Sequence, residues 1–214
     1  MLTVSAKTES TFEPIPEGTY PAVCCAVIDC GVQYNKQWDN RSRKVAIGWE
    51  IPSETYKDKD GVEHPRSIYN TYTASLSPKG ILRKDLKAWR GRDFTADELE
   101  KFDLKNIVGV PCMLLIIHSE KAGKVFANIG GVLAMPKGMP KPALSGYATI
   151  FDLDTDPLED IEKLPTWIGN LIKQSETYMD RAAGQIVKES AEEKEVEEPT
   201  FTPLDDDDDD SLPF

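Results

Sequence analysis

The segment KVAIGWEI, Lys44–Ile51, indicates the type of fold most clearly. Its odd-numbered residues are apolar, and its even-numbered residues are charged or small. This alternation is the period of a β-strand with one buried face. The apolar set is Val45, Ile47, Trp49 and Ile51. Upstream, GTYPAVCCAVIDC (Gly18–Cys30) is rich in strand-forming residues, and downstream RSIYNTYTASL (Arg66–Leu76) is dense in Tyr and Thr. Three successive strands are therefore predicted.

A helical segment, residues 77–105, follows these strands. Apolar residues recur there at helical spacing, Gly91 ends the first helix, and Thr95 with Glu98 forms a capping box. Strand patterns return at Val108–Ser119 and Lys124–Met135 around a tight turn. The order predicts a mainly β fold with helices, α+β: a five-stranded OB-like barrel with a helical insert between strands 3 and 4. A small sandwich is the alternative, because strand number does not separate the two.

The two ends of the chain differ from this body. Residues 1–17 are polar, contain Pro14 and Pro16, and predict a flexible N-terminal arm before an OB-like domain over 18–155. Thr149–Leu153 is a candidate for a short last strand. A helical extension over 156–188 contains one long amphipathic helix, Thr166–Lys188. Residues 189–214 are acidic and are expected to be disordered.

Charge is distributed unevenly along the chain. The net charge is −12, but residues 187–214 alone contribute −10, from twelve acids and two lysines. Residues 31–92 contain thirteen Lys and Arg against seven Asp and Glu, a local charge of +6. A locally basic body with a separate acidic tail is compatible with nucleic-acid binding, although the total charge is not.

Sequence-tolerant binding of single strands needs cations along the phosphates and aromatic rings beside the bases. The aromatic candidates are Tyr34, Trp38, Tyr69, Tyr72 and Phe126. The cationic candidates, chosen because they cluster, are Lys36, Arg41, Arg43, Lys44, Arg66, Lys79, Arg83, Lys84, Lys87, Arg90, Lys121 and Lys124. Any one of these cations alone is an ordinary solvated surface charge.

The aromatic candidates differ in context. Trp38 lies in the polar segment 33–43, which is expected to be a loop, and is therefore assigned to stacking. Tyr69 and Tyr72 lie three residues apart on a strand, so one is core and the other exposed, and the sequence does not decide which. Phe126 is either a groove residue or a core residue at the barrel end. Trp49, Trp89 and Trp167 lie on apolar faces and are expected in the core.

The chain ends in DDDDDDSLPF, an acidic run followed by an apolar tip. The run stays solvated, and a terminal Phe can enter a pocket on a partner, whereas a plain solubility tail would not need that ending. The predicted partner-binding residues are Asp205, Asp206, Asp207, Asp208, Asp209, Asp210, Leu212, Pro213 and Phe214.

This ending resembles the acidic tip of bacterial single-stranded-DNA-binding proteins. The body, from Glu17–Tyr20 through Gly91–Phe94 to 151–173, is similar to phage-encoded single-stranded-DNA-binding proteins with an OB-fold. The resemblance implies a non-enzymatic protein that binds single-stranded DNA, with the Pro213-Phe214 end docking replication or recombination proteins such as a polymerase, helicase, primase or nuclease. The insert over 77–105 and the helix before the tail depart from the bacterial pattern. The resemblance therefore does not imply the bacterial type of tetramer, and the sequence leaves open whether the chain is a monomer or a homo-oligomer.

Other classes of function find less support. The sequence contains no G-x-x-x-x-G-K-[ST], H-E-x-x-H or G-x-S-x-G motif, so no catalytic site and no cofactor is expected. The acids of 152–160 (Asp152, Asp154, Asp156, Glu159 and Asp160) could form a two-metal nuclease site, but an acidic loop and helix start is the preferred interpretation. The four cysteines, three of them in one strand, are expected to be buried thiols rather than zinc ligands.

The sequence also bears on cellular location and on one alternative function. The sequence shows neither a bilayer-length apolar run nor a signal peptide, so a cytoplasmic location without membrane contact is expected. The rival function is a phage interaction or assembly protein whose acidic tail mimics DNA and occupies a host protein.

Overall fold

The computed structural model describes residues 13–146 and 148–184. The strands are β1 (Gly18–Asn35), β2 (Asn40–Lys57), β3 (Glu63–Thr73), β4 (Pro111–Lys121), β5 (Lys124–Leu133) and β6 (Thr149–Phe151). The helices α1 (Ile81–Arg90), α2 (Ala96–Lys101) and η1 (Leu104–Ile107) lie between β3 and β4, and η2 (Leu158–Lys163) and α3 (Thr166–Lys173) follow β6. A mainly β fold with a helical insert after the third strand is confirmed.

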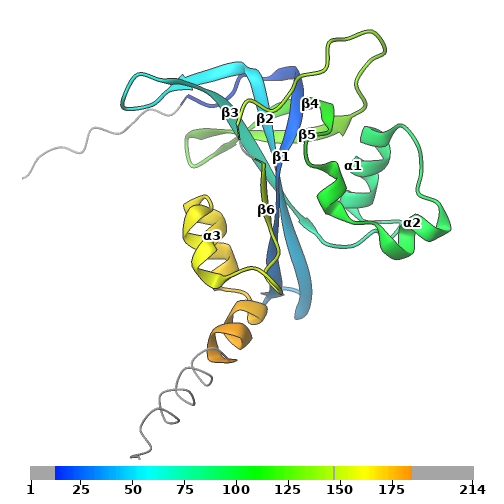
Figure 1. The fold of residues 1–214 in the computed structure, drawn as a ribbon, viewed down its shortest axis with the longest axis vertical. Helices are drawn as coiled ribbons and strands as arrows, with labels where there is room; N and C mark the ends of the chain where they lie inside the picture. The colour runs from blue at the N-terminus through cyan, green and yellow to red at the C-terminus, as the bar shows by residue number, and fades with distance from the viewer. Residues whose placement is uncertain (1–12, 147, 185–214) are drawn as a thin grey trace, which may run out of the picture.

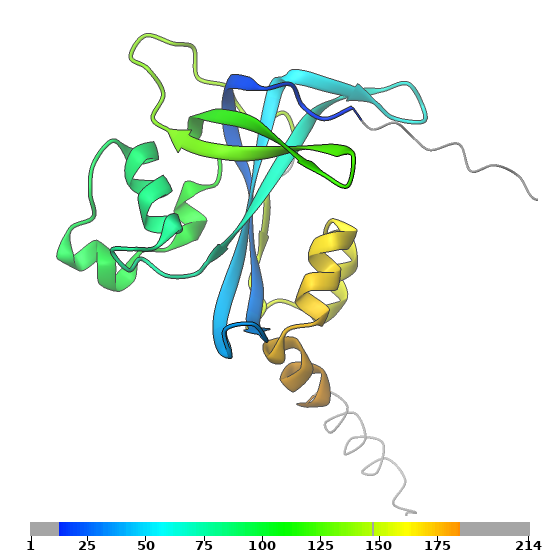
Figure 2. The ribbon, with the colours of Figure 1, turned by 180° about the vertical axis from the view of Figure 1, so that it is seen from behind.

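The strands form one sheet in the order β3-β2-β1-β4-β5, with β6 added in parallel to β1. The other pairs are antiparallel. Cα atoms of β3 and β5 approach within 8 Å, yet no hydrogen-bonded ladder joins these strands in the described chain. The sheet is therefore not closed, and the predicted barrel is not confirmed. In Figures 1 and 2, α1 and α2 lie on one side of the long β1–β2 hairpin and α3 lies on the other.

β1 is buried on both faces. Ala22, Cys24 and Val27 belong to a first core, which also takes in the apolar side of α1. Cys25, Ala26 and Ile28 belong to a second core, formed with β6 and α3. A register shift between Cys24 and Ala26 reverses the alternation at this point. Burial on both sides explains why Gly18–Cys30 is a continuous apolar run rather than an alternating one.

The alternation of KVAIGWEI is realised as predicted. Val45, Ile47, Trp49 and Ile51 all lie in the first core, whereas Ala46 lies in the second. The Trp49 ring contacts Tyr72 and Trp89, with ring centroids 6.5 and 6.0 Å apart. The expectation that Trp49 and Trp89 are core residues is confirmed, since they are 1% and 6% exposed.

The four cysteines are free and buried, as expected. Burial raises the pKa of Cys25 to about 11 and that of Cys24 to about 12. The thiols are therefore protonated at neutral pH and pack as small apolar side chains.

Two segments are more ordered than the sequence suggested. The expected loop over 33–43 is largely strand, because β1 continues to Asn35 and β2 begins at Asn40. Residues 13–17 of the expected flexible arm pack against the sheet: Ile15 is buried, and its carbonyl oxygen lies 2.8 Å from Nε2 of His118. Residues 1–12 lie outside the described chain.

The prediction of a single long helix over Thr166–Lys188 is wrong. α3 ends at Lys173, and a second helical segment covers 176–184 after a turn. Ser175 causes the break, because its buried hydroxyl accepts a hydrogen bond from the Tyr178 amide and so caps the second segment. The Leu171 carbonyl oxygen, in the last turn of α3, accepts from the Gln174 amide at 3.3 Å and also from the Gln33 side chain of β1 at 2.8 Å. Within the described residues, no helix has the length and apolar character that crossing a bilayer requires.

Replacing Ile172 with Ala tests how α3 is held. Its side chain is fully buried in the second core, so the substitution should lower the free energy of unfolding by about 2–5 kcal/mol through lost burial and a cavity. Urea denaturation provides the measurement. Met179→Ala, at a site 55% exposed in the segment 176–184, is the control and should change stability by less than about 0.5 kcal/mol. Equal effects of the two changes would contradict the packing of α3.

Candidate nucleic-acid interface

The face of β2–β3 that points away from the first core carries a stripe of hydroxyl and aromatic side chains. We call Ser67, Tyr69, Thr71 and Thr73 the β3 stripe. These residues pair across the ladder with Glu50, Gly48, Ala46 and Lys44, respectively. Ser67, Thr71 and Thr73 are exposed. Nζ of Lys44 donates a hydrogen bond to Oγ1 of Thr73 at 2.8 Å, which places this lysine at one end of the stripe.

Tyr69 is half-buried at the centre of the stripe. Its ring lies directly over Gly48, where a Cβ atom would meet Cε1 of Tyr69 at 2.4 Å, so glycine is what lets the ring lie against the strand. The Trp167 ring of α3 meets Tyr69 edge to face, with centroids 6.0 Å apart. Burial raises the pKa of Tyr69 to about 12. The fold therefore brings two candidate residues, Lys44 and Tyr69, to one face.

Tyr72 has the opposite orientation. It is 3% exposed, and its hydroxyl donates to Oδ2 of Asp85 at 2.9 Å inside the first core. Of the two tyrosines that the sequence could not separate, Tyr72 is the core residue, and Tyr69 is half-buried rather than fully exposed. Tyr72 has no ring surface available for a base.

The tip of the β1–β2 hairpin gathers four candidate residues. Trp38 is 71% exposed and Tyr34 is 43% exposed. The Tyr34 hydroxyl donates to Asp39 at 2.7 Å, and the Arg41 guanidinium lies 4.9 Å from the centroid of the Tyr34 ring. Arg41 also pairs with Glu176 at 2.7 Å. In the described chain, Lys36 has no ion pair, so this tip presents an open indole ring and one available cation.

The tip of the β4–β5 hairpin brings together three further candidate residues, Lys121, Lys124 and Phe126. Phe126 is 47% exposed, which places its side chain on the surface rather than in the core. Lys121 and Lys124 pair with each other across the ladder and are exposed. Neither lysine makes an ion pair with any residue that the structure describes. This tip therefore also combines an exposed aromatic ring with available cations.

The basic cluster on α1 has a structural role. Arg83 and Lys87 both bind Asp93, and Arg90 and Arg92 both bind Glu98. These ion pairs fasten α1 to the start of α2, where Thr95 and Glu98 form the predicted capping box. Only Lys79 and Lys84 of this group are without an ion pair in the described chain. Lys84 belongs to α1, which lies on the side of the β1–β2 hairpin away from α3 (Figure 1).

Arg43 and Arg66 point away from the β3 stripe. Arg43 binds Asp29 and Asp154, and these partners raise its pKa. Arg66 donates a hydrogen bond to the Glu13 carbonyl oxygen at 2.7 Å. Both residues help to join distant segments, so neither lies with Lys44 and Tyr69.

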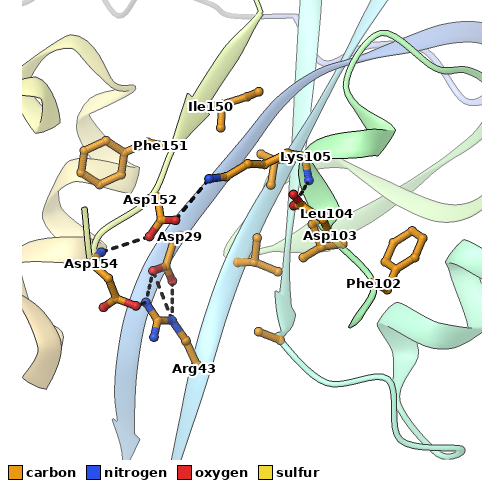
Figure 3. A pocket seen from close by; sticks show the side chains of 13 residues that line it. Asp29, Arg43, Phe102, Asp103, Leu104, Lys105, Ile150, Phe151, Asp152 and Asp154 are labelled. Atoms are coloured by element: carbon orange, nitrogen blue, oxygen red, sulfur yellow. Dashed lines mark hydrogen bonds and ion pairs between the residues drawn. The ribbon is translucent and has the colours of Figure 1, made fainter. Parts of the chain in front are cut away.

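A cavity of about 280 Å³ lies beside Arg43, between the β1–β2 hairpin, η1 and β6 (Figure 3). Carboxylates of Asp29, Asp152 and Asp154 come within 4.8 Å of one another there. Arg43 bridges Asp29 and Asp154, and Lys105 binds Asp152 at 3.3 Å. Two of the three remaining acids considered for a nuclease are used locally: Asp156 accepts from the Asp152 amide, and Asp160 pairs with Lys163. The acid-rich wall makes this cavity a poor phosphate site.

Trp167 is the residue that sequence reasoning misplaced. It was expected in the core, yet it is 47% exposed, whereas Ile168 and Ile172 on the same helix are fully buried. Successive residues turn by about 100° around a helix, so Trp167 falls at the edge of the stripe that these isoleucines define. That angular offset was available in the sequence. The predicted partner-binding residues Asp205–Asp210, Leu212, Pro213 and Phe214 lie outside the described chain.

The α1–α2 ion pairs predict a specific pH dependence. Hydrogen bonds from Arg92, helped by the Thr95 amide and Arg90, lower the pKa of Glu98 from 4.5 to about 2. Its stabilising contribution is fully present above pH 4.5 and is lost as pH falls toward 2. At pH 6 the Glu98→Gln variant should therefore have a lower melting temperature than the wild type. The two melting temperatures should converge near pH 2. A difference that is independent of pH would contradict this role of the charge.

Comparison with known proteins does not assign the chain to a family. No family model matches the sequence, and no curated protein matches it. The candidate interface is therefore defined by its own residues: the β3 stripe with Lys44, the β1–β2 tip with Trp38, and the β4–β5 tip with Phe126.

Proposed function

We propose that this chain binds single-stranded DNA without strong sequence preference during replication or recombination in the cytoplasm, and that its acidic C-terminal tip recruits partner proteins. The observation that carries the proposal is the position of the exposed aromatic residues. Trp38 is 71% exposed and Phe126 is 47% exposed, each at a hairpin tip. A base stacked on such an exposed ring contributes about 1–3 kcal/mol to binding.

The strand order supports an OB-type barrel. Five strands in the order β3-β2-β1-β4-β5, with β3 near β5 and a helix after β3, match a partly open five-stranded barrel. Such barrels hold oligonucleotides on the β2–β3 face and on the β1–β2 and β4–β5 loops. Here those three places carry the β3 stripe with Lys44, the Trp38 tip and the Phe126 tip. We infer the same mode of binding.

In this mode, stacking supplies much of the affinity and phosphate contacts supply less. Lys36, Lys44, Lys121 and Lys124 are the candidate cations at the three places that do not pair with an acid in the described residues. The arginines are already bound to carboxylates or to backbone. About four phosphate contacts correspond to a slope of roughly −3 in a plot of log K against log salt concentration for a single strand.

One observation favours the rival function. Most candidate arginines are neutralised within the fold, which weakens attraction to a polyanion. A protein that acts only through an acidic, DNA-like tail on a host protein needs no basic surface. This rival predicts weak binding to oligo-dT even at low salt, and the experiment below separates the two functions.

Binding of fluorescent oligo-dT, measured by anisotropy at several salt concentrations, tests the proposal. The wild type should bind at low salt, prefer single to double strands, and show the slope given above. Lys44→Gln should reduce the magnitude of the slope by about 0.7, which corresponds to one phosphate contact. Lys84→Gln is the matched control, because this exposed lysine lies on α1, and it should leave the slope unchanged. Absence of binding by the wild type and by a chain lacking 205–214 would overturn the function.

The acidic tip should compete with DNA, because it presents a polyanion at high local concentration. Removal of 205–214 should tighten binding of oligo-dT several-fold at low salt, and replacement of Asp205–Asp210 with Asn should have the same effect. Phe214→Ala should leave DNA affinity unchanged, because it retains all six carboxylates. The same anisotropy assay measures all three variants. Weaker DNA binding after neutralisation of the tip would contradict the competition.

A further inference from the structure

Trp167 is exposed on α3, and other residues of the helix anchor it to the core. Ile168 and Ile172 anchor α3 in the second core and are both fully buried. Trp167 lies beside them and keeps 47% of its surface exposed. An aromatic ring this open needs a partner outside the core to gain from its apolar area.

Trp167 lies against the β3 stripe. Gly48 leaves room for the Tyr69 ring on the strand, and Tyr69 in turn meets the Trp167 ring at an angle of 79°. This edge-to-face contact fixes the orientation of the indole, while its exposed fraction shows that ring surface is still accessible. Lys44 pairs with Thr73, four residues along β3 from Tyr69, which is roughly 13 Å at the rise of a strand. One short oligonucleotide can therefore reach both Lys44 and Tyr69, which contacts Trp167.

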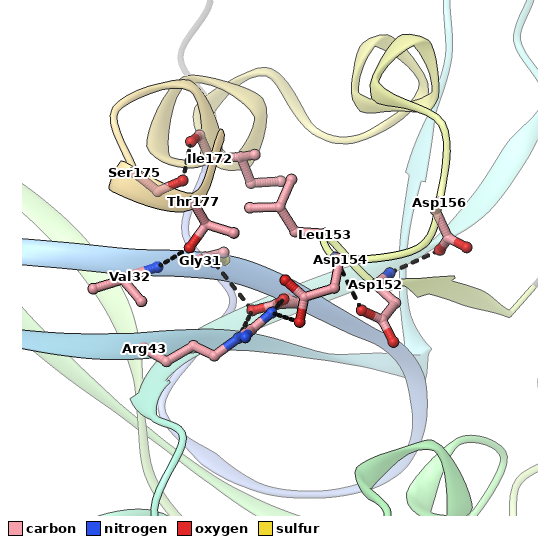
Figure 4. A network of polar contacts seen from close by, with 12 residues as sticks. Gly31, Val32, Arg43, Asp152, Leu153, Asp154, Asp156, Ile172, Ser175 and Thr177 are labelled. Atoms are coloured by element: carbon pink, nitrogen blue, oxygen red, sulfur yellow. Dashed lines mark hydrogen bonds and ion pairs between the residues drawn. The ribbon is translucent and has the colours of Figure 1, made fainter. Parts of the chain in front are cut away.

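The helix that carries Trp167 is firmly attached to the sheet. The Leu171 carbonyl accepts from the Gln33 side chain at 2.8 Å, and the Val32 amide donates to Oγ1 of Thr177 at 3.0 Å. Figure 4 shows this second contact beside Ser175, whose hydroxyl donates to the Ile172 carbonyl oxygen at 2.7 Å. The indole is thus held in place before any ligand arrives, which reduces the entropy lost on binding.

We propose that Trp167 stacks on a nucleobase of the bound single strand and, with Tyr69, forms one aromatic step of the DNA site. The helical extension after β6 is then part of the nucleic-acid interface and not only a connection to the acidic tail. This inference rests on the proposed function. It adds an element, α3, that lies outside the five strands β1–β5 of the proposed barrel.

Trp167→Ala should lower the affinity for oligo-dT by about 5- to 150-fold, the range expected for one stacked base. Because no charge is removed, the slope of log K against log salt should stay that of the wild type, in contrast to Lys44→Gln. Trp167→Phe retains an aromatic face and should recover most of the affinity. Ile81→Ala is the matched control, since Ile81 is 68% exposed on α1, and it should bind as the wild type does.

Intrinsic fluorescence gives a readout that does not depend on the stability of the Ala variant. In Trp38→Phe, Trp167 is the only exposed tryptophan, because Trp49 and Trp89 are buried. Saturating oligo-dT should quench the emission of this protein, and Trp38→Phe combined with Trp167→Phe should lose that quenching. If oligo-dT binds but Trp167 emission does not change, or if Trp167→Ala is folded and binds at full affinity, the inference is overturned while the proposed function stands. Failure of the wild type to bind would instead remove the proposed function.

Discussion

The burial of β1 on both faces explains how the other elements are arranged. One face of β1 lies in the first core with the buried side of α1, and the other lies in the second core with Phe151 of β6 and the buried side of α3. The register shift after Cys24 lets one strand serve both cores with small apolar residues. Because β2 pairs along one edge of β1 and β4 and β6 pair along the other, each candidate DNA-binding element is positioned, directly or through one neighbour, by this strand.

Ion pairs between distant segments decide which cations can meet a phosphate. Residues 31–92 have a local surplus of positive charge, yet Arg41, Arg43, Arg83 and Arg90 all bind acids from outside that window. Those acids are Asp29, Asp93, Glu98, Asp154 and Glu176. What is left for a ligand is a few lysines beside exposed rings. This balance favours a site in which stacking contributes more than charge, and it explains why a body of low net charge is compatible with the proposed function.

The residues that follow β6 are integrated with the candidate site. α3 places Trp167 beside the β3 stripe, and the segment 176–184 holds the tip that carries Trp38 through the pair of Arg41 with Glu176. Ser175, at the turn between these helical pieces, directs them toward two different parts of the sheet. The same extension therefore contacts two of the three places where we propose that DNA binds, before the chain continues to its acidic end.

Features that depend on neighbouring residues could be predicted from the sequence. Alternation in Lys44–Ile51 predicted the core-facing side of β2, helical spacing predicted the insert after β3, and Thr95 with Glu98 predicted the start of α2. Other features depend on contacts between distant segments. Tyr72 is buried while Tyr69 contacts Trp167, and Ser175 lies where the final helix is interrupted. Distant contacts also leave the sheet open between β3 and β5 and determine which cations are neutralised. The physical reason is that periodicity and capping act within a few residues, whereas burial and ion pairing depend on partners such as Glu176, which is 135 residues from Arg41.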